Sequence, residues 1–247
     1  MNALVQLIGV SKRYGASAAL HPLDMSFARG GTTVLIGPSG CGKSTVLRLI
    51  IGLLEPDTGT VEFDGSTVSM SNVSQLRHRI GYVIQEGGLF PHLTAEGNVL
   101  LMMRQLCRPQ SEMARRLDEL CELTRFPRDA RGRYPTELSG GQRQLVSLMR
   151  ALALAPELLL LDEPLGALDP LVRAALQNDL REIFQRLQQT SILVTHDLAE
   201  AAYLGDHLVL MNEGRIVQQG ALADLRDRPA NAFVTEFINA QRSLAFA

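Results

Sequence analysis

The chain has 247 residues, of which 46% are hydrophobic and 20% are charged, and its formal net charge at pH 7 is −2. This length and composition predict a globular protein with a substantial core and exclude a disordered or low-complexity chain. The near-neutral charge, without a long run of Lys or Arg, argues against a nucleic-acid partner.

Short β-like runs open the chain. Residues 5–8 and 23–27 have strand character, and turns are indicated at residues 14–15 and 29–31. This pattern predicts an antiparallel β piece at the N-terminal edge. The first six residues lack a basic stretch followed by a long apolar one, so we expect an opening strand there and no secretory signal.

A glycine-rich segment follows, between an apolar run at residues 33–36 and a helical pattern at residues 46–50. Its glycines allow successive backbone N–H groups to close around phosphate oxygens, and the helix directs its positive end at the same anion. Lys43 supplies a cation for the β- and γ-phosphates, and the Ser44 hydroxyl is placed to bind Mg²⁺. The predicted phosphate-binding residues are Gly37, Pro38, Ser39, Gly40, Cys41, Gly42, Lys43, Ser44 and Thr45.

Helical periodicity dominates the middle of the chain, after predicted strands at residues 61–64 and 80–84. We expect residues 94–155 to form a helical subdomain inserted into a sheet domain. The rest of the same single domain, residues 1–93 and 156–247, would form the α/β core.

The sheet pattern returns at residues 158–162 and 191–195, which are continuous apolar runs typical of parallel strands covered on both faces. A hairpin is predicted over residues 207–219, around Asn212-Glu213-Gly214. The expected fold class is therefore α/β with a parallel-sheet core. No apolar run approaches the ~20 residues that span a bilayer.

Two acids, Asp162 and Glu163, end the first of these buried strands. Ligands of open α/β sheets bind at this end, so Asp162 is expected to hold Mg²⁺ and Glu163 to orient and deprotonate a water molecule. The alternative is a strand that ends in solvated acids. The nearby phosphate loop in the same chain favours the catalytic interpretation.

A second anion site is indicated by Leu138-Ser139-Gly140-Gly141-Gln142, which begins a long helix with Ser139 as its N-cap. Taken alone, such a segment is more often a plain helix start after the turn at residues 134–135. Gln85 and His196 each follow a predicted strand, and a lone Gln or His at such a place is usually structural.

This combination, with Ala167-Leu168-Asp169 after the acids, resembles the ATP-binding subunits of ABC transporters, which have a P-loop NTPase (RecA-like) core. The resemblance extends from residue 12 to about residue 219. It implies that Tyr14 stacks on adenine, that Gln85 senses Mg²⁺ and that His196 contacts the γ-phosphate. It also implies a head-to-tail dimer. In that dimer, residues 138–142 of each copy, the signature segment, cover ATP held by the other copy. The implied nucleotide contacts outside the phosphate loop are Tyr14, Ser139, Gly140, Gly141, Gln142 and Asp169.

Residues 82–94 and 162–170 look like those of importers, most of all importers of glycine betaine, choline and related osmoprotectants. The implied partners are transmembrane permease subunits, a solute-binding protein and a second ATPase subunit, at the cytoplasmic face of the membrane. Residues 89–91 are either a docking surface for a membrane helix or an apolar loop packed on its own domain. Two positions depart from the family pattern. Leu145 replaces a usual Arg in the signature helix, and Gly97 replaces an acid before Asn98.

Three other functions remain open from the sequence: an importer of polar amino acids, a DNA-associated ATPase with this nucleotide-binding core, and a small-molecule kinase. A DNA-associated ATPase needs a coiled coil or a basic face, which the sequence lacks. A small-molecule kinase would give no role to the glycine-rich segment at residues 138–142. The cysteines at positions 41, 107 and 121 lack metal-ligand spacing, so a reducing compartment and no zinc site are expected.

Overall fold

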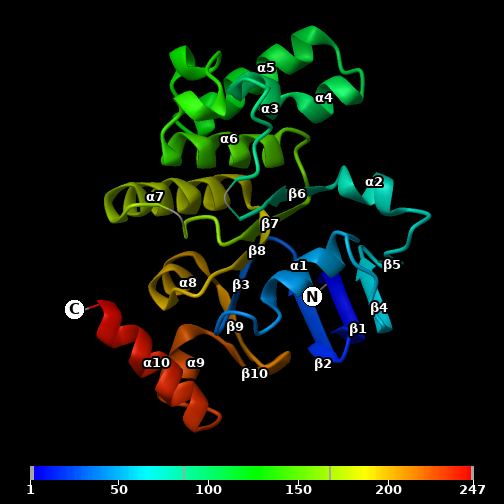
Figure 1. The fold of residues 1–247 in the computed structure, drawn as a ribbon, viewed down its shortest axis with the longest axis vertical. Helices are drawn as coiled ribbons and strands as arrows, with labels where there is room; N and C mark the ends of the chain where they lie inside the picture. Colours follow the sequence, from blue (N-terminus) through cyan, green and yellow to red (C-terminus); the bar gives the residue numbers. More distant parts are fainter. Residues whose placement is uncertain (1–2, 86, 167, 246–247) are drawn as a thin grey trace. The chain divides into compact units, whose positions relative to one another are not determined.

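A computed structural model gives the fold and describes residues 3–85, 87–166 and 168–245. The chain forms two compact units, which are described separately (Figure 1). The first unit comprises Met1–Arg77 and Gln188–Ala247, and the second comprises His78–Leu187. Ala167, the first residue of a predicted motif, lies outside the described residues.

The first unit contains an antiparallel sheet, as the sequence predicts. Its strands are ordered β2-β1-β4-β5. They comprise β1 (Ala3–Tyr14), β2 (Ser17–Ala28), β4 (Thr58–Phe63) and β5 (Ser66–Thr67). Every second side chain of β2 from Leu23 to Phe27 is buried, so one face of this strand packs on the core.

The first unit also holds four strands in the order β10-β9-β3-β8. They are β3 (Thr32–Ile36), β8 (Thr190–Val194), β9 (His207–Asn212) and β10 (Arg215–Gly220). β3 is parallel to both β8 and β9, whereas β9 and β10 form the predicted antiparallel hairpin. Every residue of β3 and β8 is buried, as expected of central parallel strands.

Helices α1 (Lys43–Ile50) and α8 (Leu198–Leu204) follow directly after two of these strands, so their first turns lie near the carboxyl ends of β3 and β8. The remaining helices of this unit are α2 (Val73–Arg77), α9 (Leu222–Asp227) and α10 (Ala232–Ala245).

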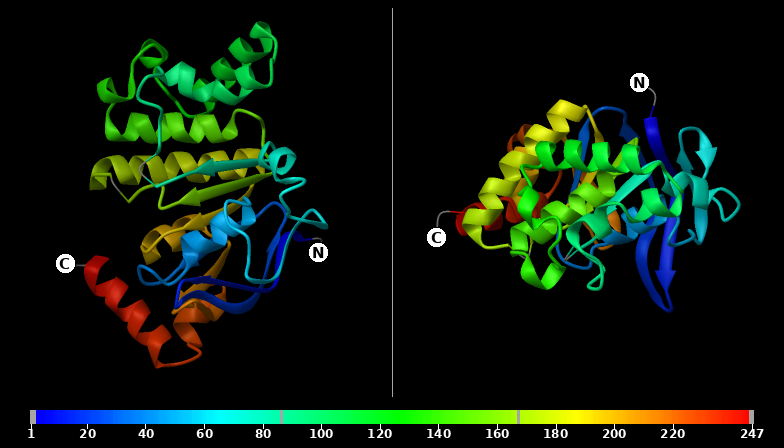
Figure 2. Two further views of the ribbon diagram at one scale, coloured as in Figure 1. Left: turned by 45° about the vertical axis from the view of Figure 1, so that its right-hand side comes forward. Right: turned by 90° about the horizontal axis from the view of Figure 1, so that it is seen from above.

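The second unit is mainly helical. Its two strands, β6 (Ile80–Val83) and β7 (Leu158–Asp162), are parallel. The helices are α3 (Ala95–Val99), α4 (Leu101–Gln105), α5 (Gln110–Leu123), α6 (Gly140–Leu152) and α7 (Pro170–Leu187), with 3₁₀ turns at Arg128–Ala130 and Pro135–Glu137. Helices α6 and α7 run side by side in Figure 1 and in the left view of Figure 2. Among the described residues, no helix combines the length and apolarity needed to span a bilayer.

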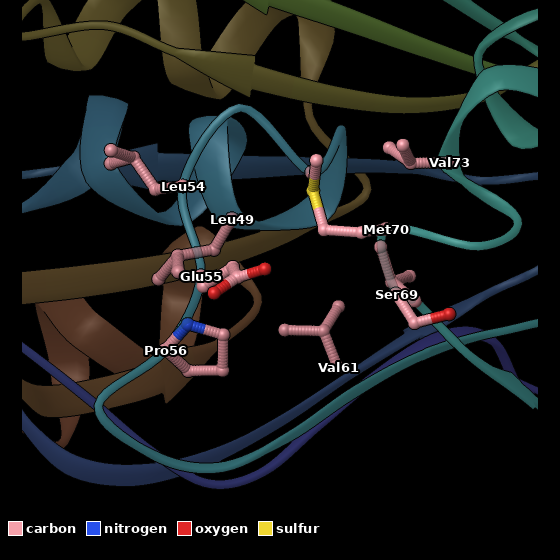
Figure 3. Close-up of a pocket in the computed structure, with 10 residues that line it drawn as sticks. Leu49, Leu54, Glu55, Pro56, Val61, Ser69, Met70 and Val73 are labelled. Atoms are coloured by element: carbon pink, nitrogen blue, oxygen red, sulfur yellow. The ribbon is translucent and has the colours of Figure 1, made fainter.

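An apolar pocket of about 310 Å³ lies in the first unit, at the opposite end of α1 from the glycine-rich loop (Figure 3). Side chains of Leu49, Val61, Met70 and Val73 line it. None of the residues that line this pocket is a predicted site residue.

Asn98 fixes the loop that leads into α3. Its side chain is fully buried and accepts a hydrogen bond from Phe90 N at 2.8 Å. It also donates to the carbonyl oxygens of Phe90, Leu93 and Thr94 at 3.1, 3.1 and 3.0 Å. One buried amide therefore satisfies the backbone of a loop that has no regular secondary structure.

We predict that Asn98→Ala lowers the free energy of unfolding by about 2–4 kcal/mol, because it leaves buried backbone groups without partners. The control is Asn72→Ala. Asn72 also bonds backbone groups, at Ser69 N and Thr67 O, but those bonds are exposed to solvent. Its loss should cost less than about 1 kcal/mol in the same urea titration. Equal costs for the two variants would contradict this account of the loop.

Candidate functional site

The glycine-rich loop connects β3 to α1. Gly37, Gly40 and Gly42 have φ angles of 142°, 78° and 107°, a region that side chains disfavour. Lys43 begins α1 and is only 5% exposed, and its ammonium group donates to the carbonyl oxygens of Gly37 and Pro38 at 2.7 and 3.0 Å. The loop therefore curls around the Lys43 ammonium group, with the N-terminus of α1 at its base.

Neighbouring backbone leaves no room for side chains at two of these glycines. A Cβ at Gly37 would lie 2.1 Å from Met211 O, and a Cβ at Gly42 would lie 2.7 Å from Ala19 O. At Gly40 a Cβ would meet open space. At Gly37 and Gly42 the loop thus packs too closely on neighbouring backbone to carry side chains. Its curled, glycine-rich backbone suits a phosphate group held by backbone N–H groups.

Tyr14 ends β1 and is 48% exposed, so its ring is available for stacking. Asp57 holds this strand end in place. Its carboxylate accepts from Arg13 N and from Lys12 Nζ, each at 2.7 Å. The hydrogen bond from Lys12 and that from the Arg13 backbone lower the pKa of Asp57. Sequence reasoning missed Asp57, because its partners lie about 44 positions away.

His196 follows β8 in the same unit, with an exposed side chain between two more buried residues, Thr195 and Asp197. The first unit thus contains Tyr14, the glycine-rich loop and His196. The other predicted site residues all belong to the second unit.

Asp162 and Glu163 lie at the carboxyl end of β7, as predicted. Asp162 is 4% exposed, and one of its carboxylate oxygens accepts a hydrogen bond from the Tyr82 hydroxyl at 3.4 Å. Glu163 has a φ of 46°, a left-handed conformation unusual for a residue with a side chain. Strained backbone of this kind often occurs at functional sites.

Gln85 follows β6 and is exposed. The loop after it is fastened to α6. Ser147 Oγ donates to Gly87 O at 2.9 Å, and the Arg150 guanidinium group donates to the carbonyl oxygens of Gly87 and Gly88 at 2.9 and 2.8 Å. Burial lowers the pKa of Arg150. Neither Ser147 nor Arg150 was predicted from the sequence to hold this loop, because no local sequence pattern indicates their hydrogen-bond partners.

Ser139 is the N-cap of α6, as predicted. Its hydroxyl accepts from Gln142 N at 3.2 Å, and the Gln142 side chain accepts from Ser139 N at 3.0 Å. This reciprocal pair is a capping box. Sequence reasoning identified the cap and assigned Gln142 to the ligand without noticing that its side chain closes the box.

The start of α6 packs against the start of α7. A Cβ at Gly141 would lie 2.7 Å from a methyl group of Val172, and one at Gly140 would lie 3.3 Å from Leu168. Asp169 caps α7 by accepting from Val172 N at 3.1 Å. Within the second unit, the signature segment and the residues around Asp169 are therefore neighbours.

Leu145 and Gly97, the two positions that depart from the family pattern, have different surroundings. Leu145 is half-buried on α6. Gly97 is buried, and a Cβ there would lie 3.2 Å from the Leu93 Cβ and 3.3 Å from Thr94 Oγ1. An acid at this position would require its neighbours to shift, so glycine fits the local packing.

Comparison with known proteins agrees with this geometry. Residues 20–166 match the ABC transporter family. The chain belongs to this family. An ABC cassette of known structure, the dimeric bacterial cassette MJ0796, superposes with a TM-score of 0.80 at 30% identity, covering 88% of this chain and 98% of that one. The predicted fold class is confirmed.

Three relatives of this ABC cassette show the range of transported solutes. A glycine betaine uptake ATP-binding protein of Escherichia coli K12 is 44% identical over 95% of this chain and 76% of its own length. A glycine betaine/carnitine/choline transport ATP-binding protein of Bacillus subtilis 168 is 42% identical over 97% of this chain. A sulfate/thiosulfate import ATP-binding protein of Mycobacterium tuberculosis H37Rv is 43% identical over 99% of this chain and 69% of its own length. The chain spans 63% of the Bacillus protein's length.

Two glycines of the loop between β3 and α1 provide a matched pair of variants for a stability measurement. Gly42→Ala should lower the free energy of unfolding by about 2–4 kcal/mol, because the new Cβ overlaps backbone and is strained by the positive φ. Gly40→Ala carries a similar φ strain without the overlap, so about 1 kcal/mol is expected. Urea titration without nucleotide measures both, and a larger cost at Gly40 would contradict the packing described.

Proposed function

We propose that the protein is the ATP-hydrolysing subunit of an ABC importer for a small solute, an osmoprotectant of the glycine betaine or choline class. The observation that carries the proposal is the glycine-rich loop curled around Lys43, in a chain whose strand β7 ends in the buried acid Asp162 and is followed by the strained Glu163. The names of the Escherichia coli and Bacillus subtilis relatives support the substrate class.

In this proposal, residues 37–45 bind the phosphates of ATP and Tyr14 stacks on its adenine. Glu163 takes a proton from the attacking water, and His196 contacts the γ-phosphate. Ser44, Gln85 and Asp162 would hold Mg²⁺, for which oxygen ligands are suited, and the ion would offset negative charge on the phosphates.

The second glycine-rich segment has its role in a dimer. We propose that Ser139 and Gly141, with Gly140, Gln142 and Asp169, contact ATP held by a second ATPase subunit. The described structure of MJ0796 is dimeric, which supports this arrangement for the family. ATP would then favour the closed dimer, and its hydrolysis would release it.

The proposed partners are transmembrane permease subunits, which a solute-binding protein would supply with solute, and the proposed location is the cytoplasmic face of the membrane. Phe90, which is 43% exposed on the loop fixed by Asn98, is the proposed docking point for a membrane helix. Residues 94–155 are proposed to act as a signature subdomain of one ATP-binding domain.

Glu163→Gln tests the hydrolytic role. The amide preserves the shape of the side chain but cannot accept a proton, so we expect turnover to fall by about 10²- to 10⁴-fold with unchanged ATP binding. With Mg-ATP the variant should run as a stable dimer in size-exclusion chromatography. Parental turnover in this variant would refute the assignment.

Glu157→Gln is the matched control, because Glu157 precedes the other end of the same strand. Its carboxylate pairs with the Arg79 guanidinium at 2.6 Å, away from the carboxyl end of β7. This variant should retain parental ATPase activity and remain monomeric or dimeric as the parent does.

Solute uptake tests the substrate class. Cells that lack the gene should lose uptake of labelled glycine betaine or choline at high osmolarity, and the parental gene should restore it, whereas the Glu163→Gln gene should not. Loss of sulfate uptake alone would assign the protein to the class of the mycobacterial relative. Loss of a polar amino acid alone would favour the second importer class.

A further inference from the structure

His196 occupies an exposed position within a strongly anchored turn. Its neighbour Thr195 is 2% exposed, and Glu200, four residues further on, is 3% exposed. A carboxyl group is costly to bury, so Glu200 requires an explanation that apolar packing does not provide. The proposed function assigns no role to it.

Thr195 is fixed by three hydrogen bonds. Its backbone N–H donates to Leu35 O at 3.2 Å, which ties it to β3 just before the phosphate-binding loop. Its hydroxyl donates to Glu200 Oε2 at 2.7 Å and accepts from Asp197 N at 3.1 Å. The hydroxyl therefore joins the residue before His196 to the residue after it.

Asp197 completes the arrangement from the other side. Its carboxylate caps α8 by accepting from Ala199 N at 2.7 Å and from Glu200 N at 3.1 Å. Glu200 lies in the first turn of that helix and reaches back to Thr195. The backbone on both sides of His196 is thus held in a closed ring of hydrogen bonds.

We propose that Glu200 is a positioning residue for His196 and that it acts through the Thr195 hydroxyl. This inference rests on the proposed function, in which His196 contacts the γ-phosphate. The carboxylate orients the hydroxyl, the hydroxyl holds the amide of Asp197, and the His196 imidazole is carried on the turn between them. Without the acceptor, the turn gains freedom and the imidazole leaves its working position.

The first test removes either end of the contact. Glu200→Ala and Thr195→Val should each lower kcat for ATP on the order of 10- to 100-fold, because small displacements of a reacting group cost that much. The Kd for ATP should stay within about twofold of the parent, since residues 37–45 and Tyr14 supply most of the proposed contacts with bound ATP. Glu200→Gln and Thr195→Ser keep an acceptor and a hydroxyl, so both should retain near-parental kcat.

Thr190→Val is the matched control for Thr195→Val. Thr190 is a buried threonine at the opposite end of β8, 6% exposed, and its hydroxyl accepts from Gly30 N at 2.9 Å. Its loss should lower the melting temperature by as much as Thr195→Val does and leave kcat unchanged.

A double-mutant cycle separates positioning from general damage. In the His196→Ala background, Glu200→Ala should cause no further loss of kcat, because the side chain that it positions is already absent. If Glu200→Ala does not fold, the Thr195→Val and Thr195→Ser pair measures the same coupling.

Additive losses in the cycle, or parental kcat in both Glu200→Ala and Thr195→Val, would overturn the inference. So would an equal kcat loss in Thr190→Val. A parental protein without any ATPase activity would overturn the proposed function instead. An active parent in which only His196→Ala loses turnover would leave that function in place and reject the role of Glu200.

Discussion

Close contact between the glycine-rich loop, residues 37–42, and neighbouring backbone is the constraint on which the first unit depends. The loop meets β2 at Ala19 and β9 at Met211, at distances that exclude a Cβ from Gly42 and Gly37. The turn between β9 and β10 joins the same cluster, because Gly214 N donates to Cys41 O at 3.1 Å and Gly214 O accepts from His21 N at 3.0 Å. The antiparallel sheet and the hairpin of β9 and β10 therefore support the shape of a loop that neither contains.

The sequence predicted features that depend on near neighbours. The glycine-rich loop between a strand and a helix, the buried strand that ends at Asp162 and the Ser139 cap each follow from a few consecutive residues, and the structure has all three where the sequence predicts them. The hairpin of β9 and β10 belongs to the same class. Secondary-structure propensity and residue spacing are sufficient to predict a feature when its physical cause lies in neighbouring residues.

Other features could not be predicted from the sequence. The residues involved have partners that are remote in sequence, or their burial follows only from the fold. Asp57 holds the strand end that carries Tyr14 from about 44 positions away, and Arg150 holds carbonyl groups about 62 positions away. Glu200 looks like a solvated acid on a short helix until the fold shows it to be buried. The left-handed backbone of Glu163 likewise has no sequence signature, since glycine or asparagine is the usual residue there.

The capping box at Ser139 bears on which amino acids evolution can accept at the start of α6. Aspartate and asparagine cap helices as well as serine does. A serine hydroxyl, however, still has a proton to offer after its oxygen has accepted from Gln142 N. An aspartate would cap the helix equally well, but it would repel the ATP phosphate proposed to bind here, because a carboxylate has no donor and carries the same charge. In the proposed dimer, serine at this position would therefore serve helix stability and recognition of the phosphate together.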